Sequence, residues 1–292
     1  MIRSDVNCQY AYAKINLTLE VISQLPDGYH EYVSVMQQVQ LHDDILIQNR
    51  MDGDIVLISE LPDVPLDHRN IVWQAVTLIQ NQYSINYGAE IHIIKRIPVA
   101  AGLAGGSSDA AATLKGLNEI WDLRLSQDEM MKLGESLGMD VPFFLLGGTA
   151  LATGKGQKVK PLSPLPELFV VIANPGVYMS TKVAYENLDQ KLDWTHRYSR
   201  FTPLMLSALD SGQIDEIFKY LYNDFELIIT QKVPEISLIK ETMLAHGAQN
   251  AVLSGSGPSV FCMVTSIKQA EEIAHALQHM VPFHTITKTI CC

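Results

Sequence analysis

The chain has 292 residues, of which 47% are hydrophobic, so it is long enough for a large buried core and favours two domains over one. Its formal net charge of −11 argues against general binding to nucleic acids or anionic membranes, because both require a basic face. With no secretory signal pattern and no apolar run of the roughly 20 residues that span a bilayer, a cytoplasmic protein without a membrane or nucleic-acid partner is expected.

Residues 10–24 alternate in polarity, as a half-buried strand would. Lys14 lies inside this pattern, where an ammonium without a partner is unfavourable. Either Lys14 is a solvated lysine of an edge strand, or it works with a buried partner. The two faces of the strand are Leu17, Leu19 and Val21 on one side and Asn16, Thr18 and Glu20 on the other.

A Pro-Asp-Gly turn signal precedes Tyr29 and His30. This aromatic pair either packs a strand or offers a stacking face and a hydrogen-bonding edge to a planar base. Helix signals follow further along. Asn70 is an expected N-cap, and Ser126 with Glu129 forms an expected capping box. Strands are expected at 33–41, 43–49, 53–59 and 89–97, and helices at 71–83, 107–121 and 127–137.

The second half of the chain predicts short strands interleaved with longer helices. Glycine, lysine and proline accumulate at 153–165, so two α+β domains, residues 1–155 and 156–292, are expected to join there. Strands are expected at 167–174, 251–255, 258–265 and 284–290, and helices at 180–188, 234–247 and 267–280.

The most unusual segment runs from Pro98 to Ala110, where three glycines stand between an expected strand and an alanine-rich helix. Backbone without Cβ atoms allows close approach of N–H groups to a ligand, and the first turn of a helix favours an anion. The segment is therefore either a phosphate-binding loop or simple close packing. It matches neither a Walker A loop nor the dinucleotide pattern.

Asp140 and a second glycine-rich segment each allow two interpretations. Asp140 precedes the apolar run 141–146 and is either the N-cap of a short helical turn or a general base assisted by Lys14. The glycine-rich residues 253–259 connect two expected strands and form either a hairpin or a second ligand loop.

Taken in order, residues 12–21, 98–112 and 254–261 resemble the GHMP small-molecule kinases, which act on galactose, homoserine, mevalonate and phosphomevalonate. The resemblance covers nearly the whole chain. Residues 27–30 and 138–148 are most similar to the branch that phosphorylates the C2 hydroxyl of a cytidine-diphosphate derivative of methylerythritol, in isoprenoid precursor synthesis. Other members of the family, or a non-catalytic nucleotide-binding protein on the same scaffold, are the alternatives.

The resemblance implies roles for individual residues. Asp140 would take the proton of the acceptor hydroxyl, and Lys14 would orient Asp140 and stabilise the transferred phosphoryl group. The implied substrate-binding residues are Asn16, Tyr29, His30, Thr181 and Tyr185, with Tyr29 and Tyr185 on the two faces of the cytosine and His30 at its edge.

ATP and Mg²⁺ are the implied cofactors, with Ser107 and Ser108 as candidates for the shell of the metal. No dedicated metal cage is visible in the sequence. The implied ATP-binding residues are Asn70, Pro98, Val99, Ala100, Ala101, Gly102, Leu103, Ala104, Gly105, Gly106, Ser107 and Ser108.

The fold class implied is α+β, the two-domain GHMP kinase fold, with an N-terminal domain similar to domain 2 of ribosomal protein S5 and a ferredoxin-like C-terminal domain. The site would lie in a cleft, and the final strand near 283–290 is a candidate to rejoin the first domain. Both a monomer and a homodimer are compatible with this resemblance.

Overall fold

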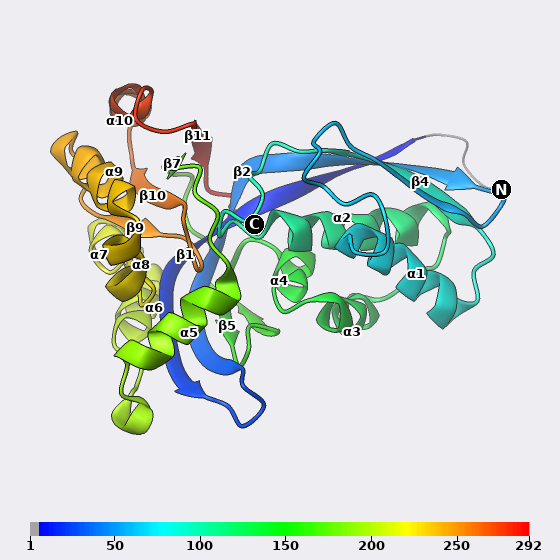
Figure 1. Ribbon diagram of the computed structural model, residues 1–292, viewed down its shortest axis with the longest axis horizontal. Helices are drawn as coiled ribbons and strands as arrows, with labels where there is room; N and C mark the ends of the chain where they lie inside the picture. The colour runs from blue at the N-terminus through cyan, green and yellow to red at the C-terminus, as the bar shows by residue number, and fades with distance from the viewer. Residues whose placement is uncertain (1–5, 292) are drawn as a thin grey trace. The chain divides into compact units, whose positions relative to one another are not determined.

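The computed structural model describes residues 6–291, and these form two compact units that interleave along the chain. The first unit holds the described residues up to Ala13 with Leu41–Val99 and Gly105–Leu146, and the second holds Lys14–Gln40, Ala100–Ala104 and the described residues from Gly147 onward. This division differs from the expected one at residue 155, because two long N-terminal strands contribute to both units. Each unit is described below by itself (Figure 1).

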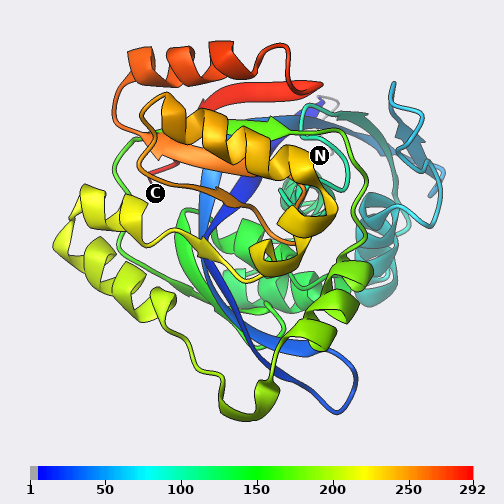
Figure 2. The same ribbon diagram turned by 60° about the vertical axis from the view of Figure 1, so that its left-hand side comes forward.

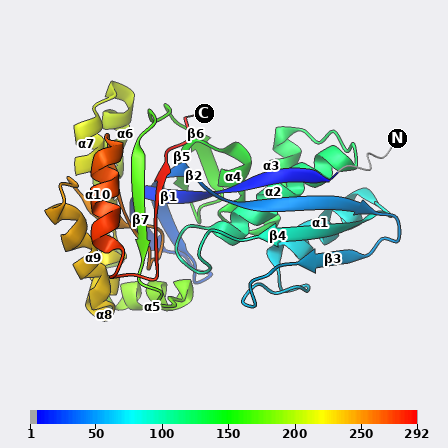
Figure 3. The same cartoon turned by 90° about the horizontal axis from the view of Figure 1, so that it is seen from above.

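The first unit is a sheet with helices gathered on one face (Figure 3). Residues 44–50 of strand β2 pair antiparallel with β4, which pairs in parallel with β3. Helix α2 packs against α1, α3 and α4. The elements are β1 (Asn7–Gln24) and β2 (His30–Arg50), each in part, β3 (Ile55–Ile58), α1 (Ile71–Tyr83), β4 (Gly88–Ile94), α2 (Gly105–Ile120), α3 (Gln127–Leu137) and α4 (Val141–Leu146).

Local sequence signals explain where the helices of this unit begin. The Asn70 side chain accepts from the Val72 N–H at 2.9 Å and caps α1, as expected. The Ser126 and Glu129 capping box of α3 is also present, and this helix ends at Gly138. The alanine-rich face of α2 is buried and allows its close packing against neighbouring helices.

The second unit contains an antiparallel four-stranded sheet in the order β11-β7-β10-β9, covered by helices α9 and α10 (Figure 2). A second set of strands joins β5, β6 and β8 to the remaining parts of β1 and β2. The elements of this unit are β5 (Thr149–Thr153), β6 (Lys158–Pro161), β7 (Phe169–Asn174), α5 (Thr181–Lys191), the 3₁₀ turn η1 (Trp194–His196), α6 (Phe201–Ser211), α7 (Ile214–Lys219), β8 (Tyr222–Asn223), α8 (Glu226–Lys232), α9 (Pro234–Ala245), β9 (Ala251–Leu253), β10 (Val260–Val264), α10 (Ile267–Leu277) and β11 (Phe283–Lys288).

Strand β1 departs from its expected exposure. Both of its faces are buried in the second unit, and the polar positions Thr18 and Glu20 are 0% and 3% exposed. Glu20 accepts from the backbone N–H groups of residues 200–202, and Thr18 contacts the Thr202 hydroxyl. The expectation of a half-buried strand is therefore wrong, because tertiary hydrogen bonds satisfy the polar side chains.

Other differences concern strand limits. The two strands expected at 33–41 and 43–49 are one continuous strand, β2. The final strand β11 pairs with β7, and the next residue, Thr289, bridges to Val39 of β2 within the second unit. Among the described residues, no helix combines the length and hydropathy that crossing a bilayer requires.

Candidate active site

The three motifs meet in the second unit around the side chain of Lys14. Lys14 is 3% exposed, and its Nζ donates to Asn16 Oδ1 at 2.6 Å and to the Gly102 backbone oxygen at 2.9 Å. The Ser254 hydroxyl donates to the same Gly102 oxygen at 2.9 Å. Lys14 is therefore a buried lysine with polar partners, and the interpretation as a solvated edge lysine is wrong.

Asn16 holds this arrangement together. Lys14 and Asn16 lie two residues apart, so they share one face of β1. Asn16 Oδ1 accepts from Lys14 and from the Gly255 N–H at 2.8 Å, while Nδ2 donates to the Ser34 hydroxyl at 2.8 Å. Its side chain is thus engaged within the protein and fixes the lysine ammonium. The substrate contact implied for Asn16 stays a prediction.

The glycine stretch has a conformation that its sequence only partly indicated. Gly102 has φ of +76°, and a Cβ there would lie 2.1 Å from the Ser254 backbone oxygen, so this glycine is required by a close approach of two loops. Ala100 and Ala104 also take positive φ values of 53° and 55°. Gly105, in contrast, begins helix α2. The glycines of this stretch therefore differ in what they do. Gly102 allows two loops to approach each other closely, and Gly105 begins a helix.

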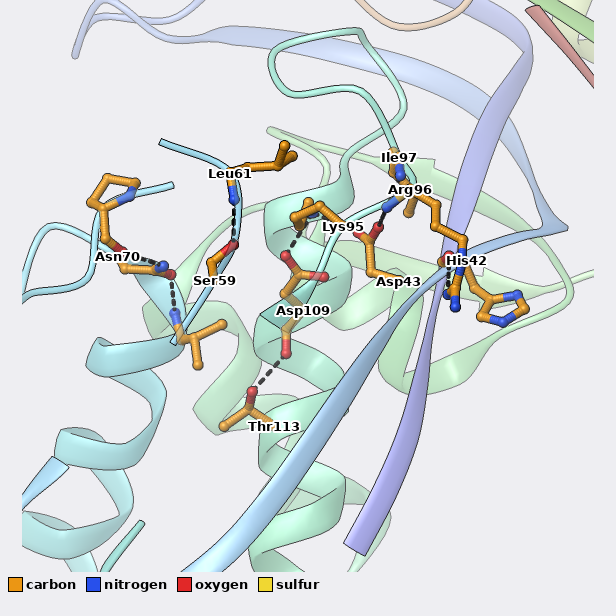
Figure 4. A network of polar contacts seen from close by, with 12 residues as sticks. His42, Asp43, Ser59, Leu61, Asn70, Lys95, Arg96, Ile97, Asp109 and Thr113 are labelled. Carbon is orange, nitrogen blue, oxygen red and sulfur yellow. Dashed lines mark hydrogen bonds and ion pairs between the residues drawn. The ribbon is translucent and has the colours of Figure 1, made fainter. Parts of the chain in front are cut away.

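The beginning of α2 lies in the first unit, beside a buried ion cluster that sequence analysis missed. Lys95 Nζ lies 2.5 Å from Asp43 Oδ2 and 2.7 Å from Asp109 Oδ2, and all three side chains are at most 6% exposed (Figure 4). A Cβ added to Gly105 would lie 3.1 Å from the same Nζ. Asp43 Oδ1 also accepts from the N–H groups of Arg96 and Ile97. The cluster thus ties the strand end before the glycine stretch to the helix after it.

Burial decides the electrostatics of this cluster. Burial and then the charge of Asp43 raise the pKa of Asp109 to about 7, although Lys95 acts in the opposite direction. Burial lowers the pKa of Lys95, but the two carboxylates outweigh it and hold that pKa above its ordinary value. Asp109 Oδ1 is buried without a hydrogen-bond partner among the described residues. No local sequence pattern indicated the cluster, because Asp43 lies in β2, Lys95 directly after β4 and Asp109 in α2.

Asp140 is a half-buried residue of the first unit, immediately before α4. Among the described residues, no backbone N–H of α4 donates to its carboxylate, and the Val141 N–H donates instead to the Gly138 oxygen at 3.2 Å. The capping interpretation therefore lacks its defining bond.

The residues expected at the cytosine come partly together in the second unit. His30 is buried, and its ring stacks on Tyr185 with 4.5 Å between centroids. Its Nε2 lies 2.7 Å from Asp189 Oδ1. Tyr29 is exposed, and Lys155 Nζ lies 4.3 Å above its ring. The structure pairs His30 with Tyr185 and adds Asp189, which the sequence did not suggest.

Thr181 and Asn70 are the remaining expected contacts. Thr181 begins α5, and its hydroxyl lies 2.9 Å from that of Ser256 in the third motif. Asn70 uses both ends of its amide within the first unit, since Nδ2 donates to the Pro65 oxygen at 2.7 Å and Oδ1 caps α1. The roles implied for both residues stay predictions.

Comparison with known proteins defines the class of this chain. The model of the GHMP kinases N terminal domain matches residues 70–148, and that of the GHMP kinases C terminal domain matches residues 205–282. Together they cover more than half of the chain, which therefore belongs to the GHMP kinase family.

Individual relatives show which members of the family this chain is similar to over nearly its whole length. A 4-diphosphocytidyl-2-C-methyl-D-erythritol kinase of Caldicellulosiruptor saccharolyticus is 42% identical over 279 residues, which cover 96% of this chain and 95% of the relative. A protein of the same name from Shouchella clausii is 45% identical, with 92% of this chain and 89% of the relative covered. A crystal structure of 4-(cytidine 5'-diphospho)-2C-methyl-D-erythritol kinase has a TM-score of 0.82 at 29% identity and covers 97% of this chain and 99% of its own.

Proposed function

We propose that this chain is an enzyme that transfers the γ-phosphoryl group of ATP to the C2 hydroxyl of 4-diphosphocytidyl-2-C-methyl-D-erythritol. The products are the 2-phosphate and ADP, and the reaction serves isoprenoid precursor synthesis. Full-length similarity to kinases of that name supports the substrate. The observation that carries the proposal is the joining of Lys14, Gly102 and Ser254 by hydrogen bonds, because it assembles the three family motifs around one ammonium.

The chemistry needs a base and a positive charge. Asp140 accepts the proton of the C2 hydroxyl as its oxygen attacks the γ-phosphorus, and the bond from that phosphorus to the ADP oxygen breaks. Lys14 stabilises the charge on the transferred group. Asn16 keeps the ammonium in one position, so little reorganisation accompanies the reaction.

The first turn of α2 suits the phosphates of ATP. It carries no acidic side chain, and its backbone N–H groups and dipole favour an anion. No group of three or more histidine, cysteine, aspartate or glutamate side chains in the described part of the chain fits a metal. We therefore expect Mg²⁺ to arrive with the nucleotide, held by Ser107 or Ser108, and to neutralise the charge on the phosphates when bound.

The acceptor site would lie beside α5. Tyr29 and Tyr185 offer ring faces to the cytosine, and His30 offers a nitrogen to its edge. Since Lys155 lies over the Tyr29 ring, binding of the base on that face would displace this cation. A small, nucleotide-linked substrate also agrees with the proposal that the enzyme is cytoplasmic. We propose that it acts as a monomer or a homodimer.

Parallel assays with different acceptors test the proposal. The purified chain receives ATP and, separately, the cytidine substrate, homoserine or mevalonate, and the products are identified by mass spectrometry. We expect phosphorylated product from the cytidine substrate alone. Product from homoserine or mevalonate would assign the chain to another branch of the family, and ATP binding without any product would indicate a non-catalytic protein.

A further inference from the structure

Helix α5 presents two side chains to His30. Tyr185 and Asp189 are four residues apart on this helix and therefore lie on one face. The Tyr185 ring is stacked on the imidazole with an interplanar angle of 20°, and Asp189 Oδ1 lies 2.7 Å from Nε2. One helix face thus fixes both the plane of the imidazole and the direction of one of its nitrogens.

The carboxylate also determines which nitrogen carries the proton. An ionised carboxylate only accepts hydrogen bonds, so Nε2 of His30 must be the donor in this pair. In the neutral ring the other nitrogen, Nδ1, is then an acceptor. The His30 side chain is 5% exposed and that of Asp189 is 26% exposed, so water competes little for the bond at the imidazole.

Gln24 holds the carboxylate from its other side. Gln24 Nε2 donates to Asp189 Oδ2 at 3.4 Å, which leaves Oδ1 directed at His30. This residue comes from the end of β1, whereas Asp189 comes from α5. The pair is therefore fixed by two elements of the second unit.

We propose that Asp189 is a positioning residue that makes the acceptor site select cytosine over uracil. Cytosine carries an exocyclic amine that donates, whereas uracil has an oxygen acceptor at the same position. When Nδ1 of His30 is held as an acceptor, it accepts a hydrogen bond from the cytosine amine. With uracil, the same nitrogen would face an oxygen that also only accepts, and the two lone pairs would repel each other. This inference rests on the proposed function, because it assumes that a nucleobase lies at His30.

The variant Asp189→Asn tests the tautomer. Because Gln24 donates at the Oδ2 position, the amide oxygen of the introduced side chain is favoured there and its NH₂ group faces His30. Nε2 must then accept, and the proton moves to Nδ1. Nitrogen NMR of the imidazole, above the ordinary titration range of histidine at about pH 6.5, should show a protonated Nε2 in the wild type and a protonated Nδ1 in the variant.

Kinetics supply the second readout. For Asp189→Asn we expect the KM of the cytidine substrate to rise by roughly tenfold to a hundredfold, the cost of one unmatched buried polar group, with the KM of ATP unchanged. Preference for the cytidine substrate over its uridine analogue should fall by a similar factor. The matched control is Glu186→Gln, which removes a charge from the solvent-facing side of the same helix and should leave the preference intact.

The outcomes separate the two proposals. If wild-type protein turns over the cytidine substrate but Asp189→Asn keeps the same base preference, the positioning role is overturned and the proposed function stands. A wild-type imidazole protonated at Nδ1 alone would also overturn it. Absence of wild-type turnover with the cytidine substrate would overturn the proposed function, and base selection by Asp189 with it.

Discussion

Lys14 and Gly102 are joined by a hydrogen bond of 2.9 Å from the lysine ammonium to the glycine backbone oxygen. The bond links a side chain of the first strand to the middle of the glycine stretch. The loop at Gly102 is thereby connected directly to the lysine side chain. In the proposed reaction, this bond would bring two motifs that are far apart in sequence to one phosphoryl group.

Replacing the lysine should therefore reduce turnover strongly. For Lys14→Met we expect kcat to fall by about 10²–10³, the usual effect of losing one donor that stabilises transferred charge. Lys268→Met, at an exposed lysine of α10, is the control and should retain wild-type kcat. Steady-state kinetics with both variants provide the measurement, and retention of kcat in Lys14→Met would contradict the role assigned to the lysine.

Asp140→Asn should separate activity from stability. The carboxylate makes no capping bond among the described residues, so we expect thermal unfolding to change little. Loss of the proposed base should lower kcat by roughly 10²–10⁴. Glu135→Gln, an exposed carboxylate of α3, serves as the matched control. An Asp140→Asn variant with undiminished kcat would remove this residue from the base role.

Gly102→Ala should damage both folding and activity. A methyl group at this position would lie 2.1 Å from the Ser254 oxygen, so the two loops must separate. Gly212→Ala is the control, because Gly212 also has a positive φ, of +65°, but open space around it. We expect Gly212→Ala to lose only about 1 kcal/mol from backbone strain. Denaturant unfolding should show a larger loss for Gly102→Ala, and equal losses would disprove the loop contact.

Asp109 should give the stability a measurable dependence on pH. Its pKa is raised from 3.8 to about 7, so the folded chain keeps a proton that the unfolded chain has released. The contribution of this group is therefore fully present below pH 3.8 and is lost as the pH rises to about 7. The variant Asp109→Asn should lack this decline. Free energies of unfolding measured over that range for both proteins provide the test, and parallel curves would contradict it.

The sequence predicted local structure well where the signal was local. Asn70 caps α1 and Ser126 begins α3 because each cap depends on residues only a few positions away. Polarity alternation failed for β1, since the burial of Thr18 depends on Thr202, which is distant in the chain. Two strands were expected where β2 is continuous, because polar residues at 42–44 interrupt the apolar pattern without interrupting the backbone pairing.

The candidate site was also predictable only in part, because several of its contacts join residues that are distant in the chain. Lys14 stood out because a charge inside a strand pattern needs a partner, and the structure supplies Asn16 and Gly102. Asp189 and Lys95 did not stand out, because a carboxylate on a polar helix and a lysine at a strand end are ordinary in sequence. Only the tertiary fold brings Asp189 to His30 and Lys95 to Asp109.

The position of the transferred phosphate tests the central claim most directly. The chain is incubated with ATP and 4-diphosphocytidyl-2-C-methyl-D-erythritol, and the product is examined by phosphorus and carbon NMR. We predict a new phosphomonoester whose phosphorus couples to the C2 carbon, formed together with one equivalent of ADP. A phosphate at another hydroxyl, or ATP hydrolysis with the acceptor unchanged, would contradict the account.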